Sequence, residues 1–188
     1  KLTSRVITRA KKNPKRVVFT EANHHKILKA AQILQDEGIA KPILLGNVKE
    51  IEALIKEHKL ELHECTIISP HEQKENIKQY AKELYEKRQR KGLTLKDCEK
   101  SLLDRNYYAA MMVEHGDADA LISGLTKDYP KTILPALQVI GTAPHVKRVA
   151  GMYIIMNKKG TFFFSDCTVN VDPTTEELVE IIGLTRMG

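Results

Sequence analysis

Short apolar runs alternate along this chain with longer segments of helical periodicity, and few folds accommodate that alternation. The apolar runs predict strands at residues 16–20, 42–45, 65–68 and 118–122. The periodic segments predict helices at 2–12, 24–37, 48–58 and 72–90, and a further helical region that opens with a Thr94–Asp97 capping box and runs to about His115. Because strands that alternate with helices favour a mostly parallel sheet covered on both faces, the sequence predicts a three-layer α/β domain over residues 1–144.

After Pro144 the pattern changes. Val149–Met156 and Thr161–Ser165 are apolar and predict a hairpin closed by Asn157–Gly160, and Asp172–Glu176 predicts the start of a helix. Two strands and one helix do not bury their apolar faces unaided. We therefore expect residues 145–188 to be the beginning of a second α/β lobe.

Charge and cysteine content exclude several classes of protein. Residues 1–16 hold seven basic residues and no acid, whereas the remaining 172 residues carry 23 basic and 24 acidic residues. Without interleaved aromatic residues, this basic end predicts a solvated helix and no nucleic-acid partner. No apolar run is long enough for a membrane span, so we expect no membrane partner. The three scattered cysteines predict neither a disulfide framework nor a metal site, and their odd number suits a reducing cytoplasm.

The segment from Gly116 to Thr142 carries the strongest indication of a ligand site. A strand over 118–122 ends in the Ser123–Gly124 turn and leads to a helix that opens near Pro130, with Asp128 as its N-cap. Open α/β sheets bind ligands where a strand end feeds a helix N-terminus, because free N–H groups and the helix dipole there favour an anion. An ordinary strand-to-helix connection is the alternative.

The same segment resembles the phosphate acetyl/butaryl transferase family, the phosphotransacetylases, through Gly116–Gly124 and Thr132–Ile140. Further matches lie at Arg16–Phe19, Glu21, Ala30–Leu34, Asp36–Gly46, Arg88, Lys91–Thr94, Met111–Val113, Phe164–Cys167, Asn170 and Asp172–Thr174. The resemblance covers nearly the whole chain but only the first part of such a domain. It implies a phosphotransacetylase or isocitrate-dehydrogenase-like αβα fold.

The resemblance also implies ligand-binding residues for acetyl-CoA or phosphate. Arg88 precedes a Lys-Gly-x-Thr motif and would contact phosphate groups, although the solvated end of a charged helix is an equal alternative. Lys127 would bind a coenzyme A phosphate, although an exposed loop lysine is more often simply solvated. Asp166–Cys167 would lie near the cleft, where a structural thiol is the commoner meaning of a lone cysteine. The full set of expected ligand-binding residues is Arg88, Ser123, Gly124, Thr126, Lys127, Asp166 and Cys167.

Two departures from the transferase pattern speak against turnover by this polypeptide. Leu134 stands where active members place an arginine that resembles a transition-state clamp, and loss of such a group costs roughly two to three powers of ten in rate. The family's catalytic serine and aspartate also lie beyond the last residue of this chain. We therefore expect no catalytic residue and no metal ligand in this segment.

The segment Gly124–Pro130 is similar to the transferase-like domain at the C-terminus of NADP-dependent malic enzymes. This similarity favours an acetyl-CoA-responsive regulatory and oligomerisation domain of a malic enzyme, whose NADP and divalent metal would be bound upstream. The alternative is part of a working phosphate acetyltransferase, which converts acetyl-CoA and phosphate to acetyl phosphate and coenzyme A. A third possibility is a dimerisation module with an empty cleft. The expected partners are a small-molecule acyl-CoA and further copies of the chain.

Overall fold

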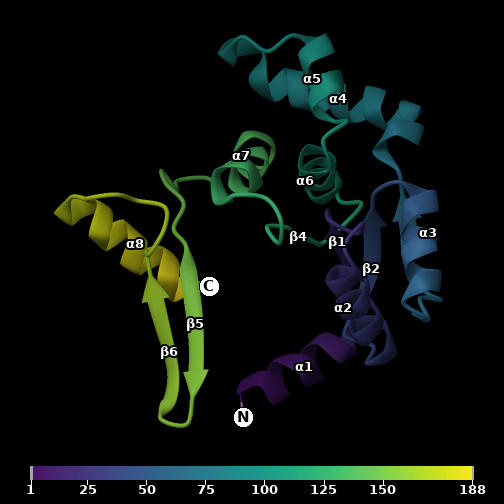
Figure 1. Cartoon of the computed structure of the whole chain (residues 1–188). Helices are drawn as coiled ribbons and strands as arrows, with labels where there is room; N and C mark the ends of the chain where they lie inside the picture. Colours follow the sequence, from purple (N-terminus) through teal and green to yellow (C-terminus); the bar gives the residue numbers. More distant parts are fainter. Residues whose placement is uncertain (1, 188) are drawn as a thin grey trace. The chain divides into compact units, whose positions relative to one another are not determined.

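The computed structural model describes residues 2–187 and divides into two compact units, Lys1–Gly141 and Thr142–Gly188. Each unit has its own sheet, and the second unit has one helix, α8, among the described residues (Figure 1). None of the helices within residues 2–187 is long and apolar enough to cross a membrane.

A four-stranded parallel sheet forms the centre of the first unit, in the order β3-β2-β1-β4. Its strands are β1 (Lys15–Phe19), β2 (Ala40–Leu45), β3 (Thr66–Ile68) and β4 (Ala120–Ile122). Val18 of β1 aligns with Ile43 of β2 on one side and with Leu121 of β4 on the other. The three-layer α/β fold with a mostly parallel sheet, predicted from the alternating pattern, is confirmed.

Helices cover both faces of this sheet because successive strand residues point to opposite sides. On one face Phe19 packs with Leu28 of α2 and Ile51 of α3, and on the other Val18 belongs to a core cluster with Leu84 of α4. The helices of this unit are α1 (Leu2–Lys12), α2 (His25–Asp36), α3 (Val48–Glu57), α4 (Lys74–Arg88), α5 (Leu95–Ser101), α6 (Arg105–His115) and α7 (Tyr129–Val139), with the 3-10 turns η1 (Pro70–Glu72) and η2 (Gln89–Lys91).

The helical region expected from Thr94 to about His115 consists of two helices in the structure, α5 and α6. The capping box at the start of α5 is confirmed, with Thr94 and Asp97 each accepting the other's backbone N–H. The division between the two helices lies at Asp104. Its carboxylate accepts the Asn106 N–H at 2.8 Å and caps the start of α6. An aspartate that bonds a nearby backbone N–H favours a helix start over a helix interior.

Strand β4 is shorter than the segment 118–122 from which it was predicted, since it spans Ala120–Ile122. Strand β4 pairs only with β1 among the described residues. Ile122 is 47% exposed. Apolar residues between two turns predict a strand, but they do not reveal how many neighbours the strand has.

The helix that follows β4 is α7, and its predicted N-cap is confirmed. The Asp128 carboxylate accepts the Lys131 N–H at 3.3 Å, and the helix begins at Tyr129, one residue before Pro130. Pro135 lies inside this helix, where it lacks the N–H that would bond the Lys131 carbonyl one turn earlier.

The second unit contains the predicted antiparallel hairpin, formed by β5 (Met152–Asn157) and β6 (Gly160–Ser165), followed by α8 (Thr175–Met187). The Asn157 side chain closes the turn by accepting the N–H groups of Lys159 and Gly160. Apolar side chains on both faces of the hairpin are exposed, namely Tyr153, Ile154, Ile155, Met156, Phe162, Phe163 and Phe164. The interpretation of this unit as the beginning of a larger lobe stays a prediction.

Candidate functional site at the carboxyl edge of the sheet

The carboxyl ends of the strands in the first unit surround a cavity of about 450 Å³. This is the edge at which open parallel sheets place their ligands. The lining residues come from the turns after β1, β2, β3 and β4 and from the start of α6, and they are Asn23, Gly46, Asn47, Glu50, Ser69, Pro70, His71, Glu72, Leu103, Asp104, Arg105 and Lys127.

The loop after β4 reaches this edge, but its N–H groups are not free. The carboxylate of Glu21, at the carboxyl end of β1, accepts the N–H groups of Gly124 at 2.8 Å, Leu125 at 2.7 Å and Thr126 at 2.7 Å, and also the Thr126 hydroxyl. Burial alone would raise the pKa of Glu21, but these donors outweigh it and lower the pKa to about 2. The expectation of free N–H groups for a ligand anion is therefore wrong at residues 124–126, since an internal carboxylate occupies them.

The Ser123 side chain is fixed by a hydrogen bond to a residue of α6. Its hydroxyl donates to the Asn106 side-chain carbonyl at 2.9 Å, and Asn106 is 2% exposed. The Asn106 amide donates in turn to the Lys131 carbonyl at 3.4 Å, which is the carbonyl that Pro135 leaves without a helical N–H. One buried amide therefore joins α6, the end of β4 and the first turn of α7.

The two fixed cations of the cavity are both engaged within the protein. Lys127 Nζ donates to the Asp104 carboxylate at 2.8 Å, and Arg105 Nη1 donates to the Asn23 side-chain carbonyl at 2.8 Å. The carboxylates of Glu50, Glu72 and Asp104 line the same cavity, so its acids outnumber these cations. The cavity thus offers many hydrogen-bonding groups, but by itself it does not form a strongly cationic pocket for several phosphates.

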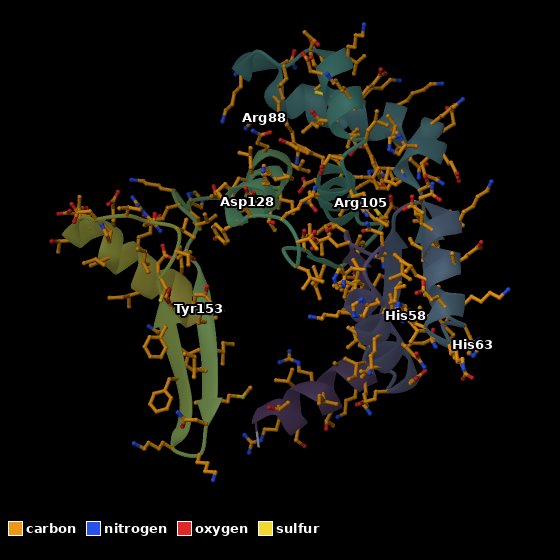
Figure 2. The ribbon with its side chains drawn as sticks, viewed as in Figure 1. His58, His63, Arg88, Arg105, Asp128 and Tyr153 are labelled. Carbon is orange, nitrogen blue, oxygen red and sulfur yellow. The ribbon has the colours of Figure 1, made fainter. Side chains whose placement is uncertain are left out.

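Arg88 lies at the end of α4 and does not line this cavity, whereas Arg105 lies at the start of α6 (Figure 2). Arg88 is half-buried, and its Nε is buried without a hydrogen-bond partner among the described residues. An unpartnered buried donor of this kind carries a free-energy cost of desolvation. The structure thus places Lys127 at the cavity and leaves Arg88 outside it.

Asp166 and Cys167 belong to the second unit. Burial alone would raise the pKa of Asp166, but its carboxylate accepts the N–H groups of Asn170 at 2.7 Å, Gly151 at 3.0 Å and Thr168 at 3.2 Å, and these bonds lower the pKa to about 2. Asp166 therefore organises the loop after β6. Cys167 is exposed and forms no disulfide within the described residues.

Within residues 2–187, no group of three or more histidine, cysteine or carboxylate side chains has the geometry to hold a metal ion. The polar residues that organise the carboxyl edge are Glu21, Asp104, Arg105 and Asn106, none of which was predicted from the sequence to act there. Glu21 was noticed only as a match to the family. An acid directly after a buried strand is the signal that could have found it, because a buried carboxylate requires partners.

A parallel sheet with its polar loops gathered at the carboxyl edge defines a ligand-binding α/β protein. The model of the phosphate acetyl/butaryl transferase family matches residues 1–185, so the chain belongs to that family. The phosphate acetyltransferase of Acetivibrio thermocellus is 35% identical over 182 residues, which is 94% of this chain and 54% of that protein. The phosphate acetyltransferase of Thermoanaerobacterium thermosaccharolyticum is 37% identical over 182 residues and is covered to 55%.

Solved structures give the same result. A phosphotransacetylase from Streptococcus pyogenes superposes with a TM-score of 0.89 at 33% identity, over 96% of this chain and 55% of that one. The EutD phosphotransacetylase from Staphylococcus aureus superposes with a TM-score of 0.83 at 27% identity, over 95% of this chain and 55% of that one. The chain spans about half the length of the curated relatives it matches.

The leading expectation of a malic enzyme regulatory domain is wrong. The relatives at 35 to 38% identity are phosphate acetyltransferases, and they favour the alternative interpretation. The expectation depended on the short segment Gly124–Pro130, which is a surface loop and the first residues of α7. Such loops vary more among related proteins than the elements they connect, so a match along the whole chain outweighs them. The linked expectations of NADP chemistry and allosteric regulation receive no support.

Proposed function

We propose that this chain forms part of a phosphate acetyltransferase, which transfers an acetyl group between coenzyme A and inorganic phosphate. The single observation that carries the proposal is the cavity at the carboxyl edge of a sheet that superposes on a phosphotransacetylase with a TM-score of 0.89. The name of the relatives at 35 to 38% identity supports the same reaction. Acetyl-CoA or coenzyme A is the proposed ligand.

In this proposal the chain binds and orients the substrates. Both substrates are anionic, and acyl transfer between them requires charge compensation more than covalent help from the protein. Lys127 and Arg105 supply two cations at the cavity, each held by a neighbouring side chain. Because Glu50, Glu72 and Asp104 offset this charge, the proposal requires further cations for the phosphate groups. Arg88 remains a candidate through the resemblance alone, since it does not line this cavity.

The proposal is tested by assaying the full-length gene product for formation of acetyl-CoA from acetyl phosphate and coenzyme A. We expect turnover by the wild-type protein. Lys127→Ala is expected to raise KM for an anionic substrate about tenfold, since it removes one charge-assisted contact. Lys131→Ala is the matched control, because Lys131 lies four residues later on the exposed start of α7, pairs with Asp128 and does not line the cavity.

Leu134 provides a second test. Its side chain is 47% exposed on α7, so replacement by a longer side chain creates no buried clash. If its position contributes to transition-state stabilisation as the resemblance implies, Leu134→Arg raises kcat by about tenfold or more. A wild-type protein that neither turns over nor binds coenzyme A would overturn the proposed function.

A further inference from the structure

Glu21 carries a buried charge that is compensated by backbone groups of a single distant loop. The residue is 3% exposed, and charged side chains reach such burial only when they are paired or fully hydrogen-bonded. The compensation comes from three consecutive N–H groups and one hydroxyl of residues 124–126, more than one hundred positions along the chain. Successive N–H groups that converge on one anion form a nest, which in other proteins receives a ligand anion.

We propose that Glu21 is a positioning residue for the ligand site, because its carboxylate fills this nest and so fixes Lys127 at the cavity. The inference rests on the proposed function, since it assigns Lys127 a role in binding the anionic substrate. Glu21 itself does not line the cavity and is not assigned contact with the substrate.

The route from Glu21 to the cavity is short. Lys127 directly follows Thr126, whose N–H and hydroxyl both donate to Glu21. At its other end the Lys127 ammonium meets Asp104, the N-cap of α6, at 2.8 Å. The direction of Lys127 is therefore set by its backbone, which Glu21 holds, and by its carboxylate partner.

Loss of the Glu21 charge should destabilise the loop at residues 124–126 more than the sheet. Gly124, Leu125 and Thr126 are exposed, so water can take the place of the carboxylate as acceptor. Ser123 remains bonded to Asn106, and β1 remains paired with β4. We therefore expect the loop to become mobile around a preserved strand pair, with Lys127 displaced from its present position.

A second carboxylate joins β1 and β4 at their amino ends, away from the cavity, and serves as a control for Glu21. Asp119, at the amino end of β4, accepts the Arg16 N–H at 2.8 Å and Arg16 Nε at 3.1 Å. It thus joins β1 to β4 as Glu21 does, but it lies at the edge away from the cavity. A purely structural role for Glu21 predicts that the two carboxylates are equivalent in function.

The experiment compares Glu21→Gln with Asp119→Asn in the full-length gene product. The first readout is hydrogen exchange of the backbone amides of residues 124–126. We expect exchange of at least part of this set to rise about tenfold in Glu21→Gln, because one of the two accepting oxygens becomes an NH2 group that cannot accept and the remaining oxygen loses its charge. In Asp119→Asn the exchange at residues 124–126 should stay within about twofold of wild type. The second readout is steady-state kinetics with coenzyme A and acetyl phosphate.

In the kinetics, Glu21→Gln should raise KM about tenfold or more with a smaller change in kcat, since it displaces a binding group. Asp119→Asn should leave KM within about twofold of wild type. Equal KM values for both variants, or unchanged exchange at residues 124–126 in Glu21→Gln, would overturn the inference. If the wild-type protein shows no turnover, the proposed function fails, while the exchange readout still decides whether Glu21 holds the loop.

Discussion

Carboxylates that accept backbone N–H groups recur in this chain, at Glu21, Asp119 and Asp166, and each has a pKa near 2. For Glu21 and Asp166 burial opposes ionisation and the hydrogen bonds overcome it, whereas the Arg16 guanidinium is the largest influence on Asp119. These residues share a physical role, since each ties together segments that are separate in the sequence.

The lowered pKa of Glu21 makes a prediction about acid stability. Its pKa lies below the ordinary value of 4.5, so its contribution to stability is complete above pH 4.5 and is lost as the pH falls toward 2. In urea unfolding measured between pH 6 and about 2.5, the wild-type free energy of unfolding should therefore fall more steeply than that of Glu21→Gln. Parallel pH profiles for the two proteins would contradict a strongly hydrogen-bonded Glu21.

At the scale of elements, the sheet has two different core clusters. The cluster around Val18 is built with α4, α5 and α6, and the one around Phe19 is built with α2 and α3. Adjacent residues of β1 face opposite clusters. A shift of one residue in strand register would therefore turn each side chain of β1 toward the other cluster. The two-residue period of β1 and β2 thus determines where every covering helix packs.

This packing predicts a large difference between two leucines of neighbouring helices. Leu84 of α4 is 1% exposed in the core, whereas Leu95 at the start of α5 is 40% exposed. Leu84→Ala should lower the free energy of unfolding by about 2 to 5 kcal/mol, since it removes buried methyl groups and leaves a cavity. Leu95→Ala should cost less than about 1 kcal/mol. Urea unfolding of the two variants at neutral pH measures both values, and similar costs would contradict this core.

At the scale of the whole molecule, the chain divides between Gly141 and Thr142, and each unit has internal contacts of its own. In the second unit Arg148 joins the segment before β5 to α8, donating to Glu177 at 2.7 Å and to Glu180 at 2.9 Å. The Lys147 N–H also donates to Glu180 at 2.9 Å. Helix α8 is thus tied to the chain that precedes the hairpin.

Arg148→Gln should therefore weaken the second unit without changing the first. We expect faster hydrogen exchange in α8 and unchanged exchange in β1 and β2. Lys158→Gln in the exposed hairpin turn is the control, since no ion pair is recorded for Lys158 within the described residues. Equal acceleration in both units would show that they unfold together.

Individual residues show which helix ends and site residues could be predicted from the sequence. The capping box of Thr94 and Asp97 and the N-cap at Asp128 were predicted correctly, because a cap depends on residues three positions apart. The break at Asp104 was missed, since aspartate also occurs within helices and the segments on both sides are periodic. The ligand role expected for Lys127 stays a prediction, although the structure places this residue at the cavity.

The sequence by itself determined the alternating strands and helices, the parallel sheet and the family, because these depend on local periodicity and on matches along the chain. Only the tertiary structure decided that β4 pairs with β1 and that Glu21 occupies the N–H groups of residues 124–126. Both facts depend on which distant segments become neighbours. The bond between Glu21 and Gly124 joins residues 103 positions apart, and no local pattern specifies that pairing.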